Sequence, residues 1–248
     1  MAETDEWDFY PCEIDHVAAS IFLNLRYEHD QPPADADTLY RIRLPMVEPE
    51  DHGMGSAAEA QRVNALEDEM CLRAESGGLV YVARIRSRAE WEIVFYGPAA
   101  RTDTFQSLRE VFGERRTYAD IRPDPAWGFY REFLLPDEER RMWMEDRRVV
   151  QALADRGDAL TKPRRVDHWV HFATAEARDR FVRAAQEAGF QLERAATVEG
   201  GALPFGAQLH RVDPVELEHI HAVAMELVDL AAPDGGDYDG WETSMETE

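Results

Sequence analysis

Residues 166–189 read VDHWVHFATAEARDRFVRAAQEAG, and this stretch indicates a strand followed by a helix. Every second residue of its first part falls on one side of the predicted strand: Val166, His168, Val170 and Phe172. Thr174 then supplies an N-cap, and an apolar stripe at helical spacing follows it. Gly189 ends the helix.

The residues after this stretch complete a pattern of six elements. Strands are predicted at 190–198 and 205–212, around Gly200-Gly201, which suits a hairpin. Asp213 is expected to cap the next helix, and a short strand is expected near 238–243. The order βαββαβ fits a split βαβ, ferredoxin-like sandwich with two helices on one face of an antiparallel sheet.

The residues before 136 give a comparable order, ββαββαβ. A Ser56-x-x-Glu59 capping box opens the longer helix, which Gly77-Gly78 ends. The predicted elements are strands at 17–27, 38–47, 79–86, 90–96 and 118–121 and helices at 56–76 and 104–112.

We therefore expect an α+β protein with two ferredoxin-like α/β sandwich domains joined by a linker helix. The expected domains are 1–135 and 166–248, and the expected basic linker helix and loop span 136–165.

Composition excludes several classes of protein. The 248 residues are 44% hydrophobic, which is ample for packed cores and excludes wholesale disorder. No stretch approaches the ~20 apolar residues of a membrane span. The acidic opening lacks the plan of a signal peptide, and Cys12 and Cys71 are too far apart for a CxxC site. We expect a cytoplasmic protein.

Charge is the strongest compositional feature. Fifty acidic and 27 basic residues give a net charge of −23, which disfavours direct binding of nucleic acid. The acids either keep the surface soluble or attract a partner with a basic segment. Residues 140–165 are the exception, with eight basic and four acidic residues. That helix either docks on a domain through its apolar residues or contacts RNA.

No motif indicates catalysis. The sequence has no G-x-S-x-G, P-loop or G-x-G-x-x-G motif, and its paired histidines are placed to diverge. His168 and His171 are three apart on a strand and therefore point to opposite faces. We expect no catalytic residues, no metal site and no cofactor.

The C-terminal segment carries the candidate site. Residues 229–248 contain seven acids and no base, together with a tyrosine, a glycine and a tryptophan close in sequence. The aromatic residues either anchor an edge strand or bind a partner, with the acids as steering charges. The predicted partner-binding residues are Asp237, Tyr238, Asp239, Trp241 and Glu242.

Tyr238-Asp239-Gly240-Trp241, the acidic balance and the element order resemble the bacterial regulator of ribonuclease E activity B family over about 166–243. Residues 6–124 are similar to the domain of unknown function 695, through Trp91-Glu92-Ile93-Val94-Phe95-Tyr96 and the strand order. The resemblance implies a ferredoxin-like fold, a cytoplasmic location and no catalysis. It also implies that the protein binds the endoribonuclease and thereby restrains RNA degradation.

The leading hypothesis is a non-enzymatic acidic regulatory protein that binds a basic segment of a protein partner, such as ribonuclease E or a related nuclease. One alternative is a small-molecule-binding protein or an enzyme that uses a cleft between the domains. Another is a self-associating structural module, a homo-oligomer formed through sheet edges or faces.

Overall fold

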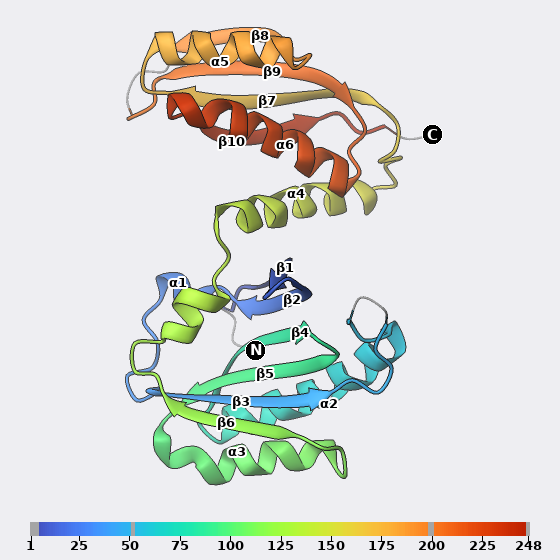
Figure 1. Ribbon diagram of the computed structural model, residues 1–248, viewed down its shortest axis with the longest axis vertical. Helices are drawn as coiled ribbons and strands as arrows, with labels where there is room; N and C mark the ends of the chain where they lie inside the picture. Colours follow the sequence, from blue (N-terminus) through green and yellow to red (C-terminus); the bar gives the residue numbers. More distant parts are fainter. Residues whose placement is uncertain (1–4, 51–52, 198–200, 247–248) are drawn as a thin grey trace. The chain divides into compact units, whose positions relative to one another are not determined.

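The computed structural model in Figure 1 describes residues 5–50, 53–197 and 201–246. The chain divides into two compact units, Met1–Arg141 and Met142–Glu248. Each unit is an antiparallel sheet with helices packed on it, which confirms the predicted α+β class and the two α/β sandwiches. None of the described helices combines the length and the hydropathy needed to span a bilayer.

The N-terminal unit contains a six-stranded sheet in the order β1-β2-β4-β5-β3-β6, with every neighbouring pair antiparallel. Its strands are β1 (Trp7–Ile14), β2 (Val17–Asn24), β3 (Thr38–Pro45), β4 (Val80–Ser87), β5 (Glu90–Gly97) and β6 (Tyr118–Pro123). Strand β1 was not predicted, and it forms a hairpin with β2.

Two helices, α2 (Ala57–Ser76) and α3 (Thr102–Arg109), cover one face of this sheet (Figure 1). They bury Val63, Met70 and Phe105 against β3 and β5. The Ser56 hydroxyl caps α2 as predicted, accepting a hydrogen bond from the Glu59 amide. The Glu59 side chain does not complete the capping box; it is buried and accepts hydrogen bonds from the amides of Val47 and Glu48.

The segment that follows β6 covers part of the opposite face of this sheet, over Tyr96 of β5. Trp127 stacks on Tyr96 of β5, with ring centroids 4.0 Å apart, and its indole N–H donates to the Ala36 carbonyl. Asp124 accepts hydrogen bonds from the Tyr96 hydroxyl and from the Phe129 amide at the start of a π-helical turn, η3 (Phe129–Leu134). Around Tyr96, the N-terminal sheet is therefore packed on both faces.

The C-terminal unit contains a four-stranded sheet in the order β10-β7-β9-β8. Its elements are β7 (Arg164–Phe172), α5 (Ala175–Glu187), β8 (Gln191–Thr197), β9 (Phe205–Asp213), α6 (Leu217–Ala231), a 3₁₀ turn η4 (Ala232–Asp234) and β10 (Asp237–Thr243). The predicted order βαββαβ is observed, and Gly200 of the predicted hairpin loop lies outside the described residues.

Helices α5 and α6 cover one face of this sheet (Figure 1), and Phe172, Phe181 and Leu227 lie in the core between them. Thr174 caps α5 as predicted. The predicted cap at Asp213 is wrong, since α6 begins at Leu217. Asp213 is the last residue of β9, and its carboxylate instead binds Arg211 and His219.

Helix α4 (Glu138–Ala154) starts in the N-terminal unit and ends in the C-terminal one. Its last turns contribute Val150 and Leu153 to the C-terminal core. The basic helix thus docks on a domain through its apolar residues, which is one of the two roles considered for it. In its first turns, Arg141 makes two hydrogen bonds to the Glu28 carboxylate, of 2.8 and 3.0 Å.

The two units share a strand order. In the N-terminal unit the elements β3-α2-β4-β5-α3-β6 arrange their strands as β6-β3-β5-β4. The C-terminal elements β7-α5-β8-β9-α6-β10 arrange theirs as β10-β7-β9-β8, which is the same order element by element. The β1–β2 hairpin is an addition beside β4 and has no equivalent beside β8.

Candidate functional site

The predicted binding segment forms β10, an edge strand that pairs with β7 alone. The pairing has a bulge between Tyr238 and Gly240, where the backbone of Gly240 has a φ of +106°. Because one extra residue is accommodated there, Tyr238 lies opposite Val170 and Trp241 lies opposite His168. Both aromatic side chains therefore lie on the helix-covered face, although they are three apart in sequence.

Tyr238 holds this strand to the core. Its hydroxyl shares a hydrogen bond of 2.8 Å with Nδ1 of His168, which is fully buried on β7. Burial lowers the pKa of His168 to about 4, so the imidazole is neutral at pH 7. Burial also raises the pKa of the Tyr238 hydroxyl, which stays protonated.

Trp241, near the C-terminal end of β10, is held by a residue of α4. Its indole N–H donates a 2.7 Å hydrogen bond to Asp146 of α4. The second oxygen of this buried carboxylate binds Nδ1 of His221 on α6 at 2.8 Å. Tyr238 and Trp241 are both half-buried and pack against the C-terminal core. The aromatic residues of the predicted site thus anchor the edge strand.

The three acidic residues of the predicted site are exposed. Asp237 is paired with His171 and Glu242 with Asp167, so both share the face of the sheet that α5 and α6 leave open. Asp239, at the bulge, lies 3.5 Å from Nε2 of His171, and its side chain is 69% exposed. The structure therefore separates the five predicted residues into two anchors behind the sheet and three carboxylates on its open side.

Trp169 lies at the centre of this open face. Strand β7 alternates buried residues toward the helices with partly exposed residues on the other side, and Trp169 belongs to the second set. It is paired with Gln208 on β9 and with Gly240 on β10. Within the described residues, the Trp169 ring stacks on no other ring and its indole N–H has no hydrogen-bond partner. An indole that is accessible on an uncovered sheet can contact a second macromolecule.

The surroundings of Trp169 are acidic. Five carboxylates and two arginines lie on the open face, identified by strand pairing and contacts: Asp167, Glu193, Asp237, Asp239 and Glu242, and Arg165 and Arg194. Arg165 is already engaged, with 2.7 and 2.9 Å hydrogen bonds to Asp167 and Glu193. The Arg165 hydrogen bond lowers the pKa of Asp167, which remains ionised.

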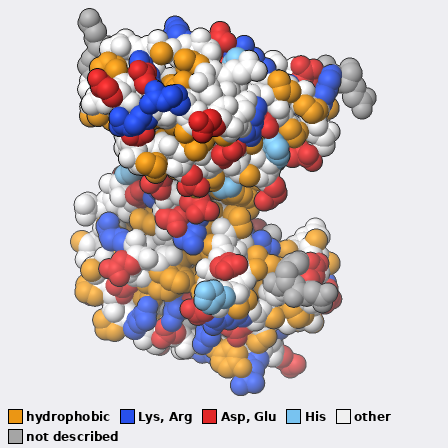
Figure 2. Space-filling model, turned by 45° about the horizontal axis from the view of Figure 1, so that its top comes forward, with side chains coloured by type: hydrophobic (Ala, Val, Ile, Leu, Met, Phe, Trp, Pro, Cys, Tyr) orange, Lys and Arg blue, Asp and Glu red, His pale blue; other side chains and the backbone are white. Residues whose placement is uncertain are grey.

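A second ring, that of His171, lies on the open face next to Trp169 along β7. His171 lies over Gly206 of β9, where an added Cβ would be 3.2 Å from its ring. The face of the molecule in Figure 2 shows acidic, basic and hydrophobic side chains intermingled on both units. The open sheet is therefore distinguished by an unpartnered tryptophan among carboxylates, and not by charge alone.

The sequence already contained the signal for this face. The alternation at 166–172 that assigns His168 to the core places Asp167, Trp169 and His171 on the opposite side. Only the absence of helices over that side, in the described part of the chain, could show that these residues remain available. The expected divergence of His168 and His171 is confirmed.

Two family comparisons cover most of the chain. Residues 5–135 match the family of unknown function DUF695, and residues 143–243 match the family Regulator of ribonuclease activity B. These are the families that the sequence resembles, in the same order along the chain. No curated protein matches it.

Two solved structures align at very low identity. One is provisionally named a glycine cleavage system transcriptional repressor; it has 8% identity and a TM-score of 0.25, and covers 84% of this chain and 98% of its own. The other is an unknown protein from Galdieria sulphuraria, with 9% identity, a TM-score of 0.24 and coverages of 84% and 99%. Neither supports an argument about fold or function. Because the match over residues 5–135 spans more than half of the 248 residues, the chain belongs to the DUF695 family of unknown function, with a C-terminal unit that matches the Regulator of ribonuclease activity B family.

Proposed function

We propose that this chain is a non-enzymatic regulator of ribonuclease activity that binds a protein partner through the open sheet face of its C-terminal unit. The family match over residues 143–243 includes all four strands of that sheet and supports the regulatory role. The observation that carries the proposal is Trp169, an unpartnered indole surrounded by carboxylates on an uncovered face.

The partner segment is basic. Carboxylates around a flat aromatic side chain favour lysine or arginine, because the charges steer the encounter and the indole contacts the cation and its methylene stem. The same charges disfavour RNA as the direct ligand. The binding partner is a ribonuclease, such as ribonuclease E, or a protein bound to it, and binding restrains RNA degradation in the cytoplasm.

The predicted binding residues have different roles in this proposal. Asp237, Asp239 and Glu242 supply the charges that meet the partner, and Tyr238 and Trp241 keep β10 in the position that presents them. Trp169 supplies the apolar contact. The division into domains 1–135 and 166–248 with a separate linker at 136–165 stays a prediction.

Quantitative affinity capture of ribonucleases from the host lysate tests this proposal. The wild-type chain is compared with Trp169→Ala and with the triple variant Asp237→Asn, Asp239→Asn and Glu242→Gln. The matched control is Glu187→Gln, Glu218→Gln and Asp229→Asn, which removes three exposed charges from α5 and α6.

We expect both open-face variants to lose at least about tenfold in captured ribonuclease, and the control triple to retain it. The purified chain should also slow RNA cleavage by the captured enzyme and cleave no RNA itself. Equal capture by the open-face and control variants, at unchanged circular dichroism, would overturn the assignment of this face. RNA cleavage by the chain alone would overturn the non-enzymatic role.

A further inference from the structure

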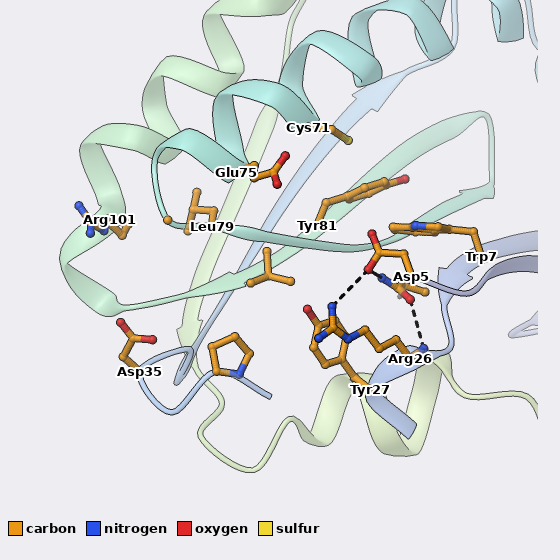
Figure 3. A pocket seen from close by; sticks show the side chains of 14 residues that line it. Asp5, Trp7, Arg26, Tyr27, Asp35, Cys71, Glu75, Leu79, Tyr81 and Arg101 are labelled. Atoms are coloured by element: carbon orange, nitrogen blue, oxygen red, sulfur yellow. Dashed lines mark hydrogen bonds and ion pairs between the residues drawn. The ribbon is translucent and has the colours of Figure 1, made fainter. Parts of the chain in front are cut away.

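The N-terminal unit contains a pocket of about 370 Å³ that the proposed function does not use (Figure 3). It forms where β2 and β4 separate. Their last paired residues are Leu23 and Ala83, after which β2 ends at Asn24 and the chain turns into α1 (Arg26–His29). Strand β4 extends further, to Val80 and Tyr81, which also line the pocket.

Three aromatic side chains, Trp7, Tyr27 and Tyr81, line the pocket. Trp7 stacks on Tyr81 with centroids 4.8 Å apart and on Phe22 at 5.0 Å. Leu79, Val80 and Pro33 add aliphatic surface to the lining. Tyr27 is only 7% exposed, yet its hydroxyl has no hydrogen-bond partner among the described residues. Figure 3 shows Tyr27 extending from α1 and Glu75 from α2, on opposite sides of the pocket.

Carboxylates outnumber available cations around the pocket. Asp5, Asp35 and Glu75 line it, and Glu75 and Asp35 make no ion pair in the described part of the chain. The Asp5 side chain is 13% exposed and is held by a 2.9 Å hydrogen bond from Asn24. The carbonyl end of α2, which stops at Ser76, adds partial negative charge.

The two arginines of the lining do not reverse this balance. Arg26 binds Asp30 at 2.9 Å and lies 3.7 Å from Asp5, so these two carboxylates neutralise its charge. Arg101 lies over Gly78, where an added Cβ would be 3.2 Å from its Nε. Figure 3 places Arg101 at the end of the pocket away from Trp7.

The acidic lining continues along α2. A second pocket, of about 570 Å³, shares Cys71, Glu75 and Tyr81 with the first and is also lined by Glu67, Asp68 and Arg84. Arg84 is 3.0 Å from the Glu67 carboxylate, which leaves Asp68 and Glu75 as the carboxylates of this wall without a described ion pair. Burial raises the pKa of Cys71 to about 12, with smaller contributions from the charges of Glu67 and Asp68. Glu75 thus lines two neighbouring pockets that both contain carboxylates and aromatic rings.

We propose that these neighbouring pockets bind a linear aliphatic polyamine. In a polyamine, methylene chains separate the ammonium groups. The carboxylates can bind the ammonium groups, and the aromatic rings between the carboxylates can contact the methylenes and the cations. Glu75 binds one ammonium group at the junction, and the Tyr27 hydroxyl accepts a hydrogen bond from another. The pocket volume is that of a small-molecule site.

Isothermal titration of the full chain with spermidine in 150 mM NaCl tests the proposal, since this salt screens diffuse attraction to an acidic surface. Glu75→Gln and Tyr27→Phe are the site variants. Glu110→Gln is the matched control, because Glu110 is an exposed acid of the same unit without a described ion pair. Magnesium at equal ionic strength and citrate serve as the alternative cation and an anion.

We expect saturable binding of one spermidine, weakened about tenfold by Glu75→Gln and unchanged by Glu110→Gln. Tyr27→Phe should weaken it less. No spermidine binding by the folded wild type, equal weakening by the control, or equal binding of magnesium would overturn the proposal. Citrate binding that depends on Arg101 would instead show an anion site.

Discussion

In the N-terminal unit, residues 124–134 cover part of the sheet face turned away from α2 and α3, whereas the described residues place no helix over the corresponding face of the C-terminal sheet. The shared strand order makes this comparison direct. Trp127 is 2% exposed and stacks on Tyr96, while Trp169 is partly exposed and stacks on no described ring. One strand arrangement therefore supports a two-sided core in one unit and a candidate binding face in the other.

The edges of the two sheets differ in the same sense. Strand β8 is an edge with almost every residue exposed, whereas its counterpart β4 is extended by the β1–β2 hairpin. The hairpin does not pair with the first residues of β4, Val80 and Tyr81, and the pocket beside Tyr81 opens there. The additions to the common arrangement thus create the N-terminal cavity, and their absence leaves the C-terminal surface open.

The largest expected contrast compares the two tryptophans. Trp127→Ala should destabilise the N-terminal unit by about 3–5 kcal/mol, because it removes a buried ring and leaves a cavity. Trp169→Ala should cost the C-terminal unit only about 1 kcal/mol, because that ring is partly in water. Hydrogen exchange with mass spectrometry reports each unit separately in the full chain. Equal losses of protection would show that the C-terminal face is as covered as the N-terminal one.

The second contrast is sensitivity to acid. His168 is neutral when folded, with its pKa lowered by burial from 6.5 to about 4. The unfolded chain therefore binds the proton first, and stability is lost as the pH falls from about 6.5 to about 4, by up to about 3 kcal/mol. In His168→Phe, the free energy of unfolding of the C-terminal unit, measured with urea, should depend less on pH over this range. A slope that is unchanged in this variant would contradict the assignment.

The third prediction concerns the hydrogen bonds that hold residues 124–134 against the N-terminal sheet. Asp124→Ala removes the acceptor for the Tyr96 hydroxyl and for the amides of Gly128 and Phe129, and should cost about 2 kcal/mol. Faster hydrogen exchange should be confined to residues 124–134 and the strand beneath them. Asp103→Ala, at an exposed acid on α3, is the control and should leave exchange unchanged. Uniform protection in Asp124→Ala would show that ring stacking alone holds the segment.

The smallest effect is expected at the C-terminal edge. Trp241→Phe keeps an aromatic ring but removes the donor to Asp146, which retains His221 as a partner. A loss of about 1 kcal/mol should result, with faster exchange in β10. If capture of the partner falls tenfold while β10 stays protected, Trp241 contacts the partner directly, and its assignment as an anchor is wrong.

Periodicity and punctuation in the sequence predicted much of this fold. The alternation at 166–172, the Thr174 cap and Gly189 were sufficient for β7 and α5, because local chemistry and tertiary packing agree there. Strand β1 was missed because its pattern is inverted: Asp8 is buried and Phe9 is 37% exposed, and Pro11 interrupts the run. The segment around Trp127, whose φ is +55°, also has no local signature.

The sequence determined by itself the α+β class, the two similar orders of elements, the excess of acids and the C-terminal Tyr238–Trp241 segment. Tertiary structure decided which of these residues remain available to a partner. A bulge of one residue turned Tyr238 and Trp241 toward the core, and the lack of a covering segment left Trp169 accessible. The physical reason is that a strand's alternation defines two faces, but only the packing of distant elements determines which face meets water.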